Sequence, residues 1–455
     1  MNGCPVHPPK PRSRPEKISL WQHLKLFRRD IFSSQPQRLY RAWMAEFRTP
    51  FFRSYFVNQP ELVDLVLKTR PDDFPKSNVI ARSLKSLLGV SVFVTNGAEW
   101  KRQRRIIDSA FEKGRLRETY PAMLAAVDAS VTRLKSGPQE VEIEAETSHL
   151  AADIIFRTLF SIPITDGAAT RVFEEFRRYQ RSQPLLNLSN FLPLPRRENR
   201  QTRESAAEIR KLLASLTAKR QQQIDENAAP DDLATKIMTT ADPETGQLFN
   251  AREMVDQVAI FFLAGHETSA SALAWALYLL ALDPSVQERV LAEVQENIGT
   301  KPPEFADIAR LSFTRDVFRE ALRLYPPVPM MVRSNKKREE FRARAIRPGS
   351  QIVLSPWHLQ RHERLWDNAD AFDPDRWQTE AGKASARVAY MPFSAGPRVC
   401  TGAGFAMIEG VLALALLVRA FRIEPSGEDP VPVAHLTVRA ENGIRLSLCP
   451  REGVE

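Results

Sequence analysis

Cysteine is scarce in this chain of 455 residues, which has only three: Cys4, Cys400 and Cys449. Their odd number and wide spacing argue against a disulfide framework and favour a reducing compartment. The chain also lacks an apolar run of about 18 residues, the length that crosses a bilayer as a helix. Its first residues do not form the apolar core of a secretory signal. We therefore expect a cytoplasmic protein without a membrane span.

Linkers and low-complexity tracts are missing too, so nothing in the composition divides the chain into several domains. Apolar residues recur at helical spacing from about residue 97 to 325, and short strand-like segments lie near both ends. We predict a mainly α fold with a small β region. Residues 1–35 are expected to form a basic tail rich in proline, and residues 36–455 a single domain.

Positive charge is in excess, since 64 Lys and Arg residues against 55 Asp and Glu residues leave a net charge of +9. Such an excess favours an acidic protein partner, an anionic ligand or nucleic acid. The chain shows neither zinc-ligand spacing nor a nucleic-acid-binding motif, so we expect no nucleic acid partner. No segment has the pattern of an FMN, FAD or NAD(P)H site, so we expect no reductase domain fused to this chain. Electrons for any redox chemistry must then come from a separate protein.

Cys400 has the most informative surroundings of the three cysteines. It lies in Phe393-Ser-Ala-Gly-Pro-Arg-Val-Cys-Thr-Gly402, and an apolar helix pattern follows from Thr401. The N-terminus of a helix stabilises an anion such as a thiolate, and a thiolate bound to haem iron favours O–O bond cleavage. Gly396 permits a tight turn, and the guanidinium of Arg398 suits a carboxylate. For a cysteine taken alone, an ordinary turn around a buried thiol is the alternative.

The other two cysteines are weaker candidates for a metal ligand. Cys4-Pro5 and Cys449-Pro450 are Cys-Pro pairs, which occur in some proteins that sense haem. Neither pair has a glycine-rich loop or a following amphipathic helix. We interpret both as coincidence, because short motifs often match by chance.

The loop around Cys400 matches the pattern Phe-x-x-Gly-x-Arg-x-Cys-x-Gly and so resembles the cytochrome P-450 family of haem-thiolate monooxygenases. The resemblance implies haem b as the cofactor and Cys400 as the ligand of its iron. It also implies that Phe393 shields the sulfur, that Gly402 leaves room for the macrocycle, and that Arg398 pairs with a propionate. The expected fold is that of the family, with haem between a long oxygen-binding helix and the Cys-bearing helix.

A second motif is Glu320-Ala-Leu-Arg323, in a helical pattern that Pro326 and Pro327 end. Residues three apart share a helix face, so the two side chains are able to form an ion pair. On its own this would be a solvated helix pair. The resemblance adds Arg376, from Phe372-Asp-Pro-Asp-Arg-Trp377, as the third member of a buried structural triad.

A third motif, Ala264-Gly265-His266-Glu267-Thr268-Ser269, interrupts a long apolar helix predicted from about 251 to 282. Glycine and polar residues in mid-helix are unfavourable and often mark a functional site. A core helix with a back-bonded hydroxyl is the ordinary interpretation. The resemblance assigns Ala264 and Gly265 to the space for O2, and Thr268 with Glu267 to a proton relay. His266 is expected to be non-catalytic.

Basic residues complete the resemblance. Trp100 and Arg104 lie one helical turn apart, a spacing that alone indicates a solvated basic helix. By resemblance both residues, together with Arg333, bind haem propionates. The neighbouring basic residues of this helix would then attract a redox partner, an acidic ferredoxin or flavodoxin supplied by its own reductase. These neighbours are Lys101, Arg102 and Arg105.

The sequence thus predicts a haem-thiolate monooxygenase that inserts one oxygen of O2 into an apolar small molecule such as a fatty acid or terpenoid. A peroxide-driven relative is one alternative, and a non-enzymatic haem-binding or sensor protein is another. By resemblance the substrate pocket draws on residues 74–94, 179–191, 258–268, 328–332 and 435–439. These segments are rich in apolar side chains, which suits a lipophilic ligand.

Overall fold

The computed structural model describes residues 5–48, 53–112, 114–182 and 199–451. Its central element is α10 (Ala251–Leu282), whose bounds agree with the predicted helix. Asn250 caps this helix through the N–H of Glu253, and the Glu253 side chain accepts the N–H of Asn250 in return. The helix is apolar nearly all round, as expected for a helix buried on every side.

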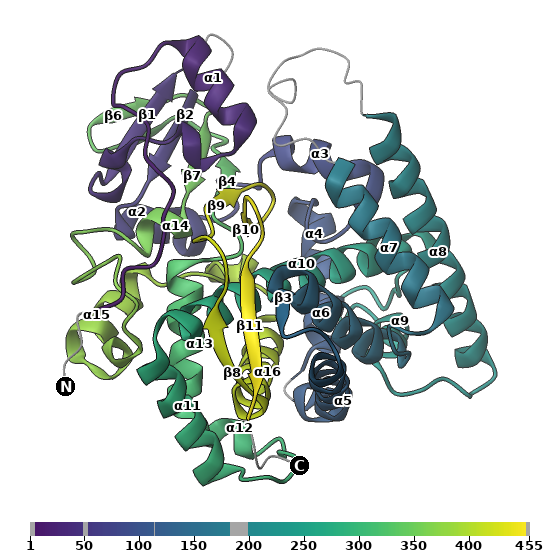
Figure 1. Ribbon diagram of the computed structural model, residues 1–455. Helices are drawn as coiled ribbons and strands as arrows, with labels where there is room; N and C mark the ends of the chain where they lie inside the picture. The colour runs from purple at the N-terminus through teal and green to yellow at the C-terminus, as the bar shows by residue number, and fades with distance from the viewer. Residues whose placement is uncertain (1–4, 49–52, 113, 183–198, 452–455) are drawn as a thin grey trace.

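Two groups of helices pack against α10 (Figure 1). On one side lie α5 (Arg115–Ser136), α6 (Ile143–Phe160), α7 (Gly167–Ser182), α8 (Arg200–Asp225) and α9 (Leu233–Thr239). On the other lie α11 (Pro284–Asn297), α12 (Asp307–Arg310), α13 (Ser312–Leu324) and α16 (Ala403–Ala420). The described part of the chain also contains α1 (Leu20–Arg29), α2 (Pro60–Asp64), α3 (Asn78–Leu88), α4 (Gly97–Ala110), α14 (Pro356–Leu359) and α15 (Glu380–Ala389).

The largest sheet among the described residues joins the two ends of the sequence. Its order is β1 (Met44–Arg48), β2 (Arg53–Val57), β7 (Gln351–Leu354) and β4 (Met331–Ser334). The β2–β7 pair is parallel and the other pairs are antiparallel. In this arrangement β7 lies between the N-terminal hairpin and β4.

Three smaller sheets complete the β region. They are β3 (Glu140–Glu142) with β11 (Arg445–Pro450) and β8 (Phe421–Pro425), β9 (Pro432–Ala434) with β10 (Val438–Ala440), and β5 (Glu339–Phe341) with β6 (Arg344–Ile346). The prediction of a mainly α fold with a small β region is confirmed.

The described part of the expected N-terminal tail lies against the rest of the protein. The N–H of Phe372 donates to Val6 O at 2.8 Å, the Tyr325 hydroxyl donates to Pro9 O at 2.6 Å, and Lys10 pairs with Asp370. The boundary at residue 35 stays a prediction.

One helix of the described chain, α16, is long and apolar enough to cross a bilayer by length and composition. In this structure 67% of it is buried inside the protein, where it contacts α5, α10, α11 and α13. That is the environment of a core helix.

Candidate active site

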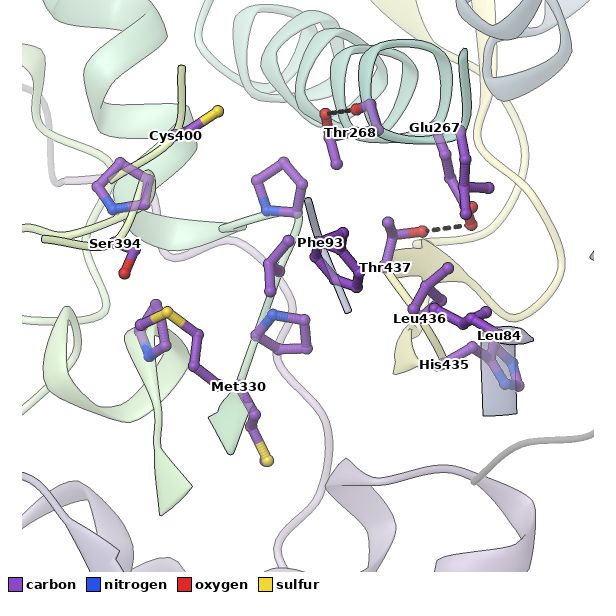
Figure 2. A pocket seen from close by; sticks show the side chains of 18 of the residues that line it. Leu84, Phe93, Glu267, Thr268, Met330, Ser394, Cys400, His435, Leu436 and Thr437 are labelled. Carbon is purple, nitrogen blue, oxygen red and sulfur yellow. Dashed lines mark hydrogen bonds between the residues drawn. The ribbon is translucent and has the colours of Figure 1, made fainter. Parts of the chain in front are cut away.

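A cavity of ≈ 990 Å³ lies between α10 and the loop that precedes α16. Figure 2 looks into it and shows Cys400 and Thr268 along one side, with Met330 on the opposite side. Both residues that the sequence singled out for oxygen chemistry therefore face the same internal space, although one comes from the loop before α16 and the other from α10, far apart in the chain.

Each segment predicted to form the substrate pocket contributes to the lining of this cavity. Among the contributors are Leu84, Tyr179, Leu263, Val328 and Leu436. Residues 183–191 of the second segment lie outside the described residues. The prediction missed a region on the N-terminal side, where α1 and the β1–β2 hairpin also line the cavity.

A tight turn presents the thiol of Cys400 to the cavity. Gly396 adopts a φ of +69°, and a Cβ at this position would lie 2.0 Å from Leu67 O, so only glycine fits. The Cys400 N–H donates to Phe393 O at 3.0 Å and closes the loop. The Phe393 ring is partly buried, packs against the core and lines the cavity next to the thiol.

The start of the Cys-bearing helix differs slightly from the expectation. α16 begins at Ala403, because Thr401 and Gly402 form a turn first. Burial raises the pKa of the Cys400 thiol, while the Gly402 N–H and the charge of Arg104 lower it. A Cβ on Gly402 would lie 3.9 Å from the Cys400 sulfur. The glycine therefore leaves open space beside the sulfur.

A cluster of positive charges lines the cavity near Trp100. The Arg398 guanidinium lies 4.8 Å from the Trp100 ring centre and Lys76 Nζ 5.8 Å from it. Burial, together with Arg333, Arg398 and Arg104, lowers the pKa of Lys76 to about 6. Burial and Arg398 lower the pKa of Arg333 to about 10. Within the described residues, Nε of Arg333 and Nε of Arg398 have no hydrogen-bond partner. Such a cluster suits an anionic ligand.

Arg104 connects helix α4 to the cysteine loop. Its Nη1 donates to Val399 O at 2.7 Å, and its Nε pairs with Asp108 at 2.6 Å. Trp100, one turn earlier, is buried. The structure thus brings Trp100, Arg104, Arg333 and Arg398 together at the cavity, as the sequence predicts, and adds Lys76 to the group.

The middle of α10 forms the cavity wall facing the thiol. The Thr268 hydroxyl donates to Ala264 O at 2.5 Å, a back-bond to the preceding turn. Ala264 is exposed to the cavity. Gly265 also lines the cavity, and a Cβ at this position would lie 2.3 Å from Ile155 Cδ1 of α6. Close packing of α6 against α10 requires this glycine, and the small side chain of Ala264 leaves the open space.

Glu267 is buried and extends toward β10, not toward Thr268 (Figure 2). Its Oε1 accepts hydrogen bonds from Thr437 Oγ1 at 2.8 Å and from Arg439 at 3.3 Å. Its Oε2 has no partner among the described residues. Proton transfer from Glu267 to Thr268 therefore requires intervening water.

His266 turns away from the cavity into the core. Its Nε2 lies 2.7 Å from Ser148 Oγ, and its ring packs 5.5 Å from the rings of Phe173 and Phe262. Burial lowers the pKa of His266 to about 3, so the ring is neutral near neutral pH. This environment is that of a packed core residue.

Comparison with known proteins decides the family. The family model described as Cytochrome P450 matches residues 11–448.

The chain belongs to the cytochrome P450 family.

Relatives of this P450 come from several organisms. Cyclooctatin synthase of Streptomyces melanosporofaciens is 32% identical over 382 residues, covering 82% of this chain and 81% of the relative. Pentalenene oxygenase of Streptomyces avermitilis is 32% identical over 405 residues, covering 88% of each. Cyclooctat-9-en-7-ol 5-monooxygenase of Streptomyces melanosporofaciens is 32% identical over 391 residues, covering 84% of this chain and 83% of the relative. Membership makes the protein a P450 monooxygenase whose cofactor is haem b.

The residues of this P450 fit haem b. The cavity offers a thiol with open space beside it, and a group of cations with unfilled hydrogen-bonding capacity. The macrocycle has propionate carboxylates, which complement such cations. Their negative charge would favour the protonated form of Lys76, whose pKa the surrounding cations depress.

The predicted triad lies outside the lining of the cavity in this P450. Glu320 pairs with Arg323 at 2.8 Å and with Arg376 at 2.9 Å. Arg323 also donates to the backbone oxygens of Gln360, Ala369 and Ala371. Burial opposes ionisation of Glu320, but the two arginines outweigh it and lower its pKa. The cluster holds α13 to the loop between α14 and α15.

Sequence reasoning did not single out two ionisable groups at the cavity of this P450, one half-buried and one buried. One is Lys76, which lies in an irregular segment without a motif. The other is Glu409 of α16, whose Oε2 accepts from Ser269 Oγ at 3.0 Å. Burial raises the pKa of Glu409 to about 8. A single glutamate within the long apolar run of α16 was the signal available for it.

Proposed function

We propose that this P450 oxygenates a terpenoid-like molecule with O2, using electrons delivered by a separate acidic protein. The observation that carries the proposal is the shared cavity, where the Cys400 thiol faces Thr268 and the cations gather near Trp100. Two relatives are named for oxygenating pentalenene and cyclooctat-9-en-7-ol, and this favours a terpenoid over a fatty acid as substrate.

In this proposal each residue of the chain has a definite task. Haem held by the Cys400 thiolate would supply the activation of O2 and the insertion of one of its oxygen atoms into a C–H bond. Trp100, Arg104, Arg333, Arg398 and Lys76 bind and orient its propionates. Phe393 keeps water from the sulfur, because its carbonyl oxygen accepts a hydrogen bond from the Cys400 N–H and the residue lines the same cavity.

Proton supply is assigned to the α10 pair. The Thr268 hydroxyl can rotate from Ala264 O to hold a water molecule in the cavity and pass on its proton. Glu267 replenishes that proton through water, since its Oε2 is free among the described residues. Retention of this acid and alcohol favours O2-driven turnover over the peroxide-driven alternative.

The expected docking patch for the redox partner is less basic than the sequence indicates. Lys101 pairs with Asp72, Arg102 with Glu253 and Arg105 with Asp242. These local pairs offset the three charges. Support for an acidic ferredoxin or flavodoxin therefore comes from the net charge of +9 and not from these residues.

The proposal is tested by the absorbance of the reduced protein with CO. We expect the red-shifted band of a thiolate ligand, and its loss in Cys400→His. Persistence of the band in that variant would contradict the ligand assignment. Incorporation of labelled O2 into a terpenoid, driven by a ferredoxin and its reductase, distinguishes the enzyme from a haem sensor. Equal turnover with hydrogen peroxide alone would favour the peroxide-driven alternative.

A further inference from the structure

The cavity has a region beneath α1 and the β1–β2 hairpin that the sequence did not predict. Its wall there includes Leu24, Phe27, Phe47 and Phe56, and is mostly apolar. One neutral polar side chain in this wall, Gln35, is 6% exposed. The same wall also holds other polar side chains: Arg14, His23, Ser34, Arg38, Glu46 and Ser54. Polar groups at fixed places in largely apolar pockets orient ligands and supply specificity.

The backbone holds Gln35 firmly in place. Its N–H donates to Phe32 O at 2.9 Å, and its carbonyl accepts from the N–H of Arg14 at 3.0 Å. The short turn Phe32–Ser34 directly precedes it. The side chain therefore starts from a fixed position in the cavity wall.

The carboxamide of Gln35 has most of its hydrogen-bonding capacity unfilled. Its Nε2 lies 3.6 Å from the sulfur of Met330, and a thioether is a weak acceptor. Its Oε1 has no partner among the described residues. Buried polar groups are nearly always hydrogen-bonded, so a molecule within the cavity is expected to supply the missing partners.

The charged groups nearby argue for a neutral partner. Arg14 donates to the backbone oxygens of Ser34, Pro15 and Glu16, and Arg38 pairs with Glu16 at 3.3 Å. These two cations already have partners within the protein. A ligand with a carboxylate group would need a cation without such a partner. A hydroxyl group suits the amide, because it accepts from Nε2 and donates to Oε1 at once.

We propose that Gln35 recognises a hydroxyl or carbonyl oxygen already present on the terpenoid-like substrate. The inference rests on the proposed function, since the ligand is the molecule that the P450 oxygenates. Met330, which touches Gln35, lies across the cavity from Cys400 and Thr268 (Figure 2). The bound oxygen function is therefore held away from the carbon that is oxidised. The reaction that supplies the substrate must itself leave an oxygen on the carbon skeleton.

The test compares hydrocarbons with their alcohols by calorimetric titration of the holoenzyme. The probes are three pairs of increasing size: menthane and menthol, farnesene and farnesol, phytane and phytol. We expect the wild type to bind at least one alcohol about fivefold more tightly than its hydrocarbon, the gain from one net hydrogen bond. In Gln35→Leu this preference is lost, while the affinity for the hydrocarbon is kept.

Two further variants make the result decisive. Gln35→Met is nearly isosteric with the wild type and lacks the amide, so it replaces Gln35→Leu if that variant does not fold. The same loss of preference for the alcohol is expected. Gln37→Leu is the matched control, since Gln37 is exposed and outside the cavity lining, and it must keep the preference for the alcohol.

Two outcomes overturn the inference: no alcohol preferred by the wild type in any pair, or a preference that survives in Gln35→Leu and Gln35→Met. Product analysis with labelled O2 is run in parallel. Binding that depends on Gln35 without any oxygenated product counts against the proposed function alone. Oxygenation without dependence on Gln35 counts against this inference alone.

Discussion

The buried carboxylates of the triad and those of the cavity differ in how completely they are paired. On the triad side Glu320 pairs with two arginines, and its pKa is lowered. On the cavity side Glu267 keeps one free oxygen among the described residues, and Glu409 has a single bond from Ser269 with its pKa raised to about 8. The saturated cluster is suited to hold the structure. The unsaturated groups are suited to bind water, protons or ligand.

The largest effect on stability is expected for the triad, where the carboxylate is fully paired. Glu320→Gln leaves Arg323 and Arg376 buried without a counter-charge, and should lower the free energy of unfolding by about 3–5 kcal/mol. Urea unfolding of the holoprotein measures it. Glu380→Gln is the control, because Glu380 forms an exposed pair with Lys383, and a change below about 1 kcal/mol is expected there. Equal losses of unfolding free energy in Glu320→Gln and Glu380→Gln would show that the triad is not a special source of stability.

Substitution of the cavity carboxylate Glu267 is expected to have a large effect on catalysis and little effect on stability. Glu267→Gln keeps the shape of the side chain but removes the acid, and should slow product formation about a hundredfold. Thr437→Val removes a hydrogen bond to Glu267 but leaves its carboxylate, and should cost less than tenfold. Rates are measured with the ferredoxin system, together with unfolding in urea. An unchanged rate in Glu267→Gln would exclude it from the relay.

The two glycines beside the cavity should respond differently to the same added methyl group. Gly265→Ala forces a Cβ to within 2.3 Å of Ile155, and should destabilise the protein by about 1–3 kcal/mol. Gly402→Ala meets the Cys400 sulfur at 3.9 Å, an ordinary contact, and should leave the apoprotein stability within about 0.5 kcal/mol. Urea unfolding of the apoprotein measures both. Shortening Ile155 to Val in the Gly265→Ala background should recover part of the loss.

The smallest effect, taken per pH unit, is a pH dependence that involves Glu409. Its pKa is about 8 in the folded protein, against an ordinary value of 4.5. Between these values the folded state binds more protons than the unfolded state, so stability falls as pH rises through this window. The slope from Glu409 is of the order of 1 kcal/mol per pH unit. Glu409→Gln should flatten the urea-unfolding profile between pH 5 and 8. A profile identical to that of the wild type would contradict the raised pKa.

Local patterns in the sequence were enough for the elements with strong signals. The bounds of α10 follow from its capping residues and from Pro284 just beyond its end. The contact of Glu320 with Arg323 follows from helical spacing, whereas the addition of Arg376 depended on the family resemblance. The Cys400 loop and the family assignment likewise came from spacing within a short segment.

Residues without a local pattern escaped prediction. Gln35, Lys76 and Glu409 meet one cavity only because distant segments pack together. The same packing offsets the charges of Lys101, Arg102 and Arg105 with carboxylates that a composition count treats as unrelated. It also places Ile155 of α6 where a Cβ on Gly265 would lie, which helical spacing alone does not reveal.

The sequence by itself determined the family of this protein, with its haem b cofactor, and the long central helix, because short-range spacing encodes a loop, a cap and a helix face. Only the tertiary structure decided which polar groups stay unsatisfied around the cavity, since burial and partnership depend on residues far apart in the chain. Gln35 shows the difference. In the sequence it is one glutamine near the N-terminus, and in the fold it is a buried amide that lines the cavity.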